Sequence, residues 1–318
     1  MGKRNNRPTR LSDPRLYPTW IGVGLFWLIG QLPWRLLQAT GRGVGRLAWH
    51  LAKKRRHIAQ TNMRLCFPEL TPEEQDALAH RCVISTGEAI LEMAGSYNNH
   101  RIDLNKNLTV TGMEHIEACR ARGQGVLLLG MHFNTLDTCS RMLATLVDIH
   151  AVYRPNDNPV IDRLIDRGRR HYVRSTVDRT DIRQMLRLLR SGEIVWYAPD
   201  QDYGRKASVF VPLFGVQAAT VTATSPFARL GKAQVVPFTQ TRLADGSGYR
   251  LTVHPPLEGF PGENETADAL RINQWVEQAI SQQPEQYMWV HRRFKTRPEG
   301  ESRPYAKRRR RKRRARRR

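Results

Sequence analysis

The stretch Gln124–Ser140, QGVLLLGMHFNTLDTCS, is the part of the chain from which both the fold and the chemistry are predicted. Its apolar run Val126–Leu129 is closed by a glycine, which is typical of a buried strand that passes into a turn. Asn134 and Thr135 are residue types that commonly cap a helix. His132 is therefore expected to lie between a strand and a helix, where side chains face a cleft.

Asp137 follows this histidine by five positions, and the geometry of that spacing depends on where the helix begins. On one continuous helix the two side chains lie ~140° apart and do not meet. If His132 precedes the first helical turn, its ring can turn toward the Asp137 carboxylate, which would orient the imidazole and stabilise its protonated form. Such a histidine can act as a general base toward a hydroxyl. The same spacing also occurs where an interior histidine is followed by an acid at a helix start, so spacing alone does not decide the role.

The composition indicates a folded chain that favours anionic partners. The 318 residues are 40% hydrophobic and 8% aromatic, and the net charge is +23. Eleven of the twelve residues Lys307–Arg318 are basic, and without these eleven charges the chain still carries +12. Such a body favours phospholipid surfaces, phosphorylated glycolipids, acidic carrier proteins or nucleic acid. We expect residues 306–318 to form a disordered polybasic tail.

The four cysteines have neither CxxC spacing nor an accompanying histidine pair. This arrangement favours buried thiols in a reducing compartment over a disulfide framework or a zinc site.

An apolar segment, Tyr17–Trp34, follows the basic N-terminal segment 1–16 and is the candidate membrane anchor. Trp20–Gly30 contains no charged residue, and the segment is at the short end for a bilayer span. We expect residues 17–38 to form one anchoring helix, single-pass or monotopic, with a buried soluble helix as the alternative. Basic residues flank both sides, so the positive-inside rule does not fix an orientation.

Helical and strand patterns alternate from Val126 onward, which predicts an α/β domain over residues 39–305 with a mostly parallel central sheet flanked by helices. We expect Ala233–Gln240 and Tyr249–Val253 to form a hairpin around a glycine-containing turn. A threonine-rich helix is expected over Ala218–Leu230.

Two further residues are candidates for the site. Arg169 belongs to a basic helix, Val160–Arg170, and a guanidinium group is well suited to bind a phosphate or a developing oxyanion. Asp200 follows the apolar strand Ile194–Ala198, at the strand end where α/β proteins bind ligands. An exposed basic helix face and an ordinary loop acid are the alternatives.

Several strings of this sequence resemble the lipid A biosynthesis late acyltransferases of Gram-negative bacteria, the lauroyl and palmitoleoyl transferase group. The strings are GMEHIE at Gly112–Glu117, the HxxxxD pair at His132 and Asp137, YRPNDNP at Tyr153–Pro159, VWYAPDQDYG at Val195–Gly204, SVFVPLF at Ser208–Phe214 and PEQYMWVHRRFKTRPEG at Pro284–Gly300. The resemblance extends from about Pro14 to Tyr305, and the last three strings are long and specific. Asp137 stands where the nearest members usually have glutamate, although the wider family accepts either, and the basic tail has no counterpart that we recognise.

The resemblance implies a bacterial inner-membrane enzyme with a glycerolipid-acyltransferase-like catalytic domain on the cytoplasmic side. Such an enzyme transfers a fatty acyl chain from acyl carrier protein to a hydroxyl of a phosphorylated, Kdo-containing lipid A precursor, Kdo2-lipid IVA, and uses no cofactor or metal. Carried over to this chain, the resemblance makes His132 the base and Asp137 its partner. Arg169 and Asp200 fall where the family has further residues needed for activity.

Three residues in the matched strings, Arg154, Asn156 and Asp202, are added as candidate substrate-binding residues. The acyl chain needs an apolar slot, which we expect near Val126–Leu129 and the Val209–Phe214 segment.

Two other functions remain open from the sequence. An acyltransferase of the same fold could act on another membrane lipid, such as a glycolipid or an ornithine lipid, because the acceptor pocket cannot be read from sequence. A nucleic-acid-binding protein is indicated only by the basic charge, and no aromatic-interleaved basic motif of a known module is present. We therefore expect no nucleic acid partner, and we expect the tail to bind anionic lipids of the inner membrane.

Overall fold

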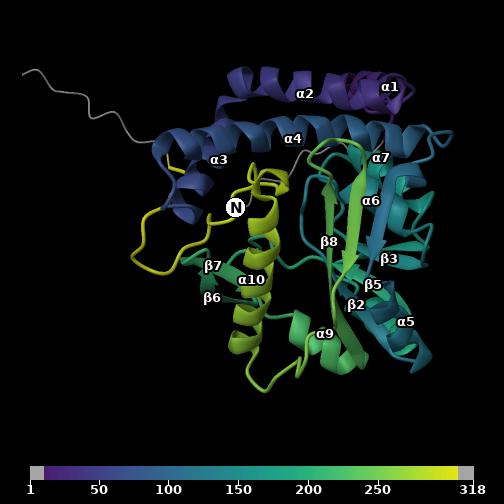
Figure 1. The fold of residues 1–318 in the computed structure, drawn as a ribbon, viewed down its shortest axis with the longest axis vertical. Helices are drawn as coiled ribbons and strands as arrows, with labels where there is room; N and C mark the ends of the chain where they lie inside the picture. Colours follow the sequence, from purple (N-terminus) through teal and green to yellow (C-terminus); the bar gives the residue numbers. More distant parts are fainter. Residues whose placement is uncertain (1–10, 307–318) are drawn as a thin grey trace, which may run out of the picture.

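The computed structural model describes residues 11–306 as a seven-stranded sheet and a separate two-stranded sheet, with helices around them (Figure 1). The strands are β1 Leu108–Thr111, β2 Gly125–Leu129, β3 Ile149–Tyr153, β4 Ser175–Asp178, β5 Ile194–Tyr197, β6 Ser208–Leu213, β7 Val216–Val221, β8 Ala233–Arg242 and β9 Tyr249–Val253. Most of the basic N-terminal segment and the polybasic tail, residues 1–10 and 307–318, lie outside the described residues.

The large sheet has the order β1-β9-β8-β2-β5-β3-β4. The five strands from β8 to β4 are mutually parallel, β9 is antiparallel to β8, and β1 is parallel to β9. The predicted α/β class with a mostly parallel sheet is confirmed, and so is the predicted hairpin of β8 and β9. The carboxyl ends of the five parallel strands meet at one edge of the sheet.

The longest helix, α4, crosses above the sheet, and α2 lies along the outer side of α4 (Figure 1). The helices are α1 Tyr17–Ile29, α2 Trp34–Leu51, α3 Lys53–Cys66, α4 Pro72–Asn98, α5 Met113–Ala121, α6 Leu136–Leu143, α7 Pro159–Arg170, α8 Ile182–Arg190, α9 Thr224–Gly231 and α10 Glu265–Gln282. A capping box of Thr71 and Glu74 begins α4.

The central strand β2 is buried on both faces. Val126 and Leu128 belong to one core cluster and Leu127 and Leu129 to the other, as expected for side chains that alternate along a strand. All four are 0% exposed. The part of the acyl slot predicted beside these four residues is therefore wrong, because helices cover the sheet on both sides and side chains fill the space. The part predicted near the Val209–Phe214 segment stays a prediction.

The single anchoring helix predicted over residues 17–38 is wrong, because the structure has two helices there. α1 ends at Ile29 and α2 begins at Trp34, after a turn that contains Pro33. Proline donates no backbone hydrogen bond and clashes with the preceding helical turn, so it separates the two helices. The 13 residues of α1 extend about 20 Å, against about 30 Å of bilayer hydrocarbon. Among residues 11–306, no helix combines the length and apolar character that crossing a membrane requires.

The helix predicted over Ala218–Leu230 is also only partly correct. Its first part belongs to β7, which pairs antiparallel with β6 so that Ala218 lies opposite Val211. Gly215, with φ of +70°, closes the tight turn between the two strands. Apolar and threonine residues suit a strand as well as a helix, and the hairpin partner decides between them.

Glycines bring α2 and α4 into close contact. A Cβ at Gly45 would lie 2.5 Å from the Cα of Ile84, and a Cβ at Gly87 would lie 2.5 Å from the Cα of Gly45. Both distances are too short for real carbon contacts, so a side chain at either position would push the helices apart.

Gly45→Leu is therefore expected to lower the free energy of unfolding by about 1–3 kcal/mol, because it overpacks this crossing. Urea denaturation measures the effect. Gly43→Leu is the matched control: it lies on the same helix with no atom within 4 Å of a Cβ, and leucine should slightly stabilise that exposed position. Equal unfolding midpoints for the two variants would contradict the packing argument.

Candidate active site

His132 lies in the turn between β2 and α6, as the sequence predicts. α6 begins only at Leu136, so helical spacing does not constrain the ring. The His132 carbonyl accepts a hydrogen bond from the Met288 amide at 3.0 Å, and the Asn134 amide donates to the Gln286 carbonyl at 2.7 Å. A segment far along the chain therefore holds this turn in place.

The partner of the His132 ring is Asp200. Nδ1 lies 2.7 Å from Asp200 Oδ1, and the His132 backbone amide donates to Asp200 Oδ2 at 2.9 Å. The hydroxyl of Tyr287 donates to the same Oδ2 at 2.8 Å. Because a carboxylate accepts, Nδ1 is assigned the proton and Nε2 keeps the lone pair that a general base needs.

The register of the strands explains why these two residues meet. β2 and β5 are parallel neighbours, and Leu129 lies opposite Tyr197. His132 and Asp200 each stand three positions beyond that pair, at the same edge of the sheet. The Asp200 side chain is fully buried, whereas 19% of the His132 side chain is exposed. The base is therefore accessible and its carboxylate partner is not.

The predicted contact between His132 and Asp137 is not formed. Asp137 Oδ1 instead accepts from the Tyr97 hydroxyl at 2.6 Å and from Arg169 Nε at 2.8 Å. Asp137 stands in the first turn of α6, which directs its carboxylate toward α4 and α7, and Asp200 already holds the imidazole. Asp137 and Arg169 form a separate, largely buried ion pair in the same site.

The surroundings keep both carboxylates charged. Burial alone would raise the pKa of Asp200, but the charge and hydrogen bonds of His132 and the bond from Tyr287 outweigh it, and the pKa is about 2. The pKa of Asp137 is also lowered despite burial, mainly by the charge and hydrogen bond of Arg169. Burial lowers the pKa of the nearby His291 to about 4, so His291 is neutral at pH 7.

The three candidate substrate-binding residues differ in their surroundings. Arg154 and Asn156 are exposed in the loop after β3, where Arg154 Nη2 lies 3.4 Å from Asp157. Asp202 is buried and accepts hydrogen bonds from the amides of Gly204 and Thr296 and from the Thr296 hydroxyl. Asp202 therefore anchors the C-terminal segment rather than offering an open binding group, and Arg154 and Asn156 stay predictions.

Sequence reasoning missed two tyrosines in this site. Tyr287 holds Asp200, and Tyr97 holds Asp137. Tyr287 lies in the aromatic string near the C-terminus, whose density of aromatic and basic residues is a signal that could have found it. Tyr97 stands near the end of a long helix, where no local pattern distinguishes it from a core residue.

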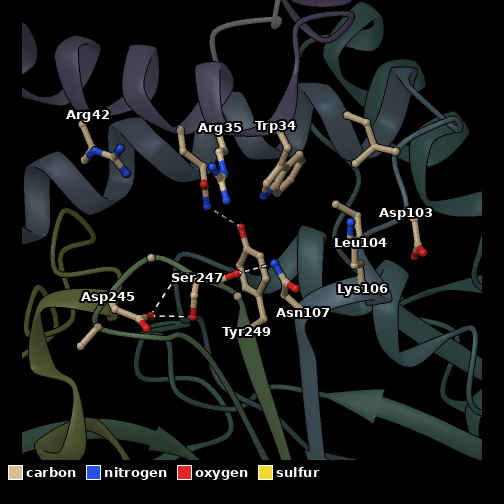
Figure 2. Close-up of a pocket in the computed structure, with 15 residues that line it drawn as sticks. Trp34, Arg35, Arg42, Asp103, Leu104, Lys106, Asn107, Asp245, Ser247 and Tyr249 are labelled. Carbon is tan, nitrogen blue, oxygen red and sulfur yellow. Dashed lines mark hydrogen bonds between the residues drawn. The ribbon is translucent and has the colours of Figure 1, made fainter.

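A cleft of about 1010 Å³ lies elsewhere, beneath α2 (Figure 2). Its walls come from α2, the loop 102–107 and the β8–β9 turn. Hydrogen bonds join these walls. The side-chain amide of Gln38 donates to the Tyr249 hydroxyl at 3.2 Å, and the side-chain amide of Asn107 donates to the Ser247 carbonyl at 2.7 Å. None of the seven candidate site residues lines this cleft, so cleft size does not locate the chemistry.

Within residues 11–306, no group of histidine, cysteine and acidic side chains is arranged to hold a metal ion. The four cysteines are free and buried, as predicted.

The strand-to-turn histidine with a buried carboxylate partner defines a candidate hydrolase or transferase site, and comparison with known proteins shows which class it is. A family model described as bacterial lipid A biosynthesis acyltransferase matches residues 4–296. The chain belongs to this family of acyltransferase enzymes, and the predicted resemblance is confirmed.

Among individual relatives, the chain is similar to the lipid A biosynthesis lauroyltransferase of Escherichia coli (strain K12), with 44% identity over 92% of this chain and 96% of the relative. It is 38% identical to the lipid A biosynthesis palmitoleoyltransferase of the same organism, over 92% of this chain and 95% of that one. A solved structure, the 1-acyl-sn-glycerophosphate acyltransferase PlsC from Thermotoga maritima, aligns over 79% of this chain and 97% of its own with a TM-score of 0.36 and 12% identity. That structural similarity is too weak to carry an argument.

Proposed function

We propose that this enzyme transfers a fatty acyl chain from acyl carrier protein to a hydroxyl of Kdo2-lipid IVA in lipopolysaccharide biosynthesis. The observation that carries the proposal is the His132–Asp200 pair, which leaves Nε2 free to act as a base at the open edge of the sheet. The names of the similar lauroyl- and palmitoleoyltransferases support a fatty acyl chain as the transferred group and a lipid A precursor as the acceptor. Acyl carrier protein as the donor is part of the proposal.

In this proposal, His132 takes the proton of the acceptor hydroxyl as the hydroxyl oxygen attacks the thioester carbonyl. A hydroxyl is a weak nucleophile, so it needs this base, and the thioester is already activated toward attack. Asp200 holds the ring and stabilises the imidazolium that forms. The carbon–sulfur bond then breaks, and the departing thiolate recovers the proton from His132.

In this proposal, Arg169 stabilises the negative charge that develops during the reaction. Its guanidinium is held by Asp137 at 2.8 Å, and only 19% of the side chain is exposed. A cation fixed in a partly buried site stabilises a developing oxyanion more strongly than one in water. The role of Asp137 is then to position Arg169, whereas Asp200 positions His132.

We also propose that the enzyme attaches to the cytoplasmic face of the bacterial inner membrane. The outer helices α1 and α2 expose large apolar side chains, including Ile21 at 74%, Leu28 at 60% and Leu51 at 71%. Such a face, with basic residues around it, suits shallow attachment to anionic lipid. Cosedimentation with vesicles of anionic phosphatidylglycerol at low salt tests the attachment. If the protein binds equally well to neutral vesicles at high salt, anionic lipid does not contribute to the attachment.

The function itself is tested by incubating the purified protein with acyl-acyl carrier protein and Kdo2-lipid IVA, followed by mass spectrometry of the lipid. The expected product carries one additional acyl chain, and its mass gives the chain length. Transfer to an ornithine lipid or another glycolipid in place of Kdo2-lipid IVA would favour the alternative acceptor. No transfer to any lipid hydroxyl would refute the proposal.

A further inference from the structure

A second cleft, of about 520 Å³, lies between α1 and α7 and adjoins the site. One wall is apolar and comes from α1, with Trp20 and Trp27. The opposite wall comes from α7, which contributes Arg163 and Arg167 together with the apolar Val160 and Leu164. This combination fits a molecule that carries both an acyl chain and an anionic group.

The arginines of α7 divide into two pairs. Arg169 is paired with Asp137, and Arg170 is paired with Asp166. Arg163 and Arg167 line the cleft, and neither forms an ion pair with any residue in the described range 11–306. The two arginines that face the cleft therefore lack the anion that guanidinium groups bind best, a carboxylate or a phosphate.

The inner wall of the cleft leads directly to the candidate catalytic groups. Gly168 lets α7 approach Tyr97 so closely that a Cβ there would lie 2.4 Å from the tyrosine ring. The Tyr97 hydroxyl donates to Asp137 at 2.6 Å, and Asp137 holds Arg169. A ligand in the cleft is thus one side chain away from the ion pair beside His132.

We propose that this cleft binds the phosphorylated acceptor lipid, with a phosphate on Arg163 and Arg167 and an acyl chain along Trp20 and Trp27. The inference rests on the proposed function and names the part of the chain that recognises its acceptor. The acceptor fits better than the donor, because the donor chain arrives on a soluble carrier, whereas the acceptor comes from the membrane. α1 exposes apolar side chains on its outer side and lines the cleft on its inner side.

The charge half of the proposal is tested with the double variant R163Q/R167Q of the full-length protein in neutral detergent micelles. The KM for the phosphorylated acceptor is expected to rise about tenfold or more, since charge-assisted hydrogen bonds are lost. The KM for acyl-acyl carrier protein should change less than about twofold. With a dephosphorylated acceptor, the wild type and the double variant should have similar KM values.

A charge-matched control is the double variant R183Q/R187Q on α8. Both arginines are exposed, and the end of their helix packs against Gly125 at the start of β2, the edge of the sheet opposite to His132. This variant removes two positive charges, as R163Q/R167Q does, and should leave both KM values unchanged. An equal rise of the acceptor KM in the two double variants would show general charge attraction and overturn the proposal.

The apolar half is tested with two glycines of α1. Gly24 lines the cleft, whereas Gly22 does not, and at both positions a Cβ would have no atom within 4 Å. Gly24→Phe should fill the cleft and raise the acceptor KM, and Gly22→Phe should not. A rise confined to the donor KM would assign the cleft to the donor and overturn the proposal.

The outcomes separate this inference from the proposed function. If the wild type transfers acyl chains but R163Q/R167Q and Gly24→Phe keep its acceptor KM, only the assignment of the cleft is refuted. If the wild type transfers no acyl chain to any lipid, the proposed function itself fails, and the cleft loses its assigned ligand.

Discussion

His132→Ala is expected to lower kcat by about 10²–10⁴-fold, the usual contribution of a general base. The variant removes Nε2, the one ring nitrogen that Asp200 leaves free. KM values for both substrates should change little, because the imidazole acts on the reacting hydroxyl rather than on the lipid body. Initial rates with acyl-acyl carrier protein and the lipid acceptor measure the effect.

His291→Ala is the control for this prediction. Burial keeps His291 neutral at pH 7, and it also lies near the site. Its side chain forms no hydrogen bond through Nε2 within the described part of the chain, so its removal should reduce kcat far less. Urea denaturation of both variants separates lost chemistry from lost folding. Equal losses of kcat in the two variants, or unchanged turnover in His132→Ala, would contradict the assignment of the base.

The position of His132 could be predicted from the sequence because it depends on neighbours along the chain. An apolar run, a glycine and two residues of types that commonly cap helices lie between Val126 and Thr135, and they are sufficient to place a strand, a turn and a helix. Thr135 takes the N-cap position of α6, but its hydroxyl donates to the Gln240 carbonyl and makes no capping bond. The sequence also contains the cause of the break between α1 and α2, which is Pro33. The prediction of one helix followed the apolar character of the segment, and hydropathy does not show that a proline cannot continue a helix.

The partner of His132 could not be predicted in this way. Asp200 is 68 positions away, and the two residues meet only because β2 and β5 are neighbours in the sheet. Alternating helices and strands predict a parallel sheet but do not give the order of its strands. Asp137 was the nearer acid along the chain, and local spacing therefore favoured it over the residue that holds the ring.

Asp200→Asn is expected to lower kcat by about 10²–10⁴-fold, because the amide can stabilise the wrong imidazole tautomer and does not neutralise the imidazolium. Rates measured from pH 5 to pH 9 should also show a changed acid limb, since the charge beside the base is gone. Protein stability gives an independent readout. The pKa of Asp200 is about 2 in the folded protein, below the value of about 3.9 for an unfolded chain.

The sign of that stability effect follows from the lowered pKa. The charged carboxylate contributes stability at all pH values above about 4, and this contribution is lost as the pH falls through about 2. The wild type should therefore lose more stability than Asp200→Asn between pH 5 and pH 2, as measured by urea midpoints. A variant with the same acid sensitivity as the wild type would mean that Asp200 is not held as a charged partner of His132.

Asp137→Asn decides which acid orients the base. This variant weakens the bonds from Tyr97 and Arg169 but leaves the contact between His132 and Asp200 intact. We expect it to reduce kcat less than Asp200→Asn and to leave the acid limb of the rate profile near its wild-type position, because the imidazole keeps its carboxylate. If Asp137→Asn instead shifted that limb and Asp200→Asn did not, Asp137 would be the orienting acid, and the strand register that pairs Asp200 with His132 would have no catalytic meaning.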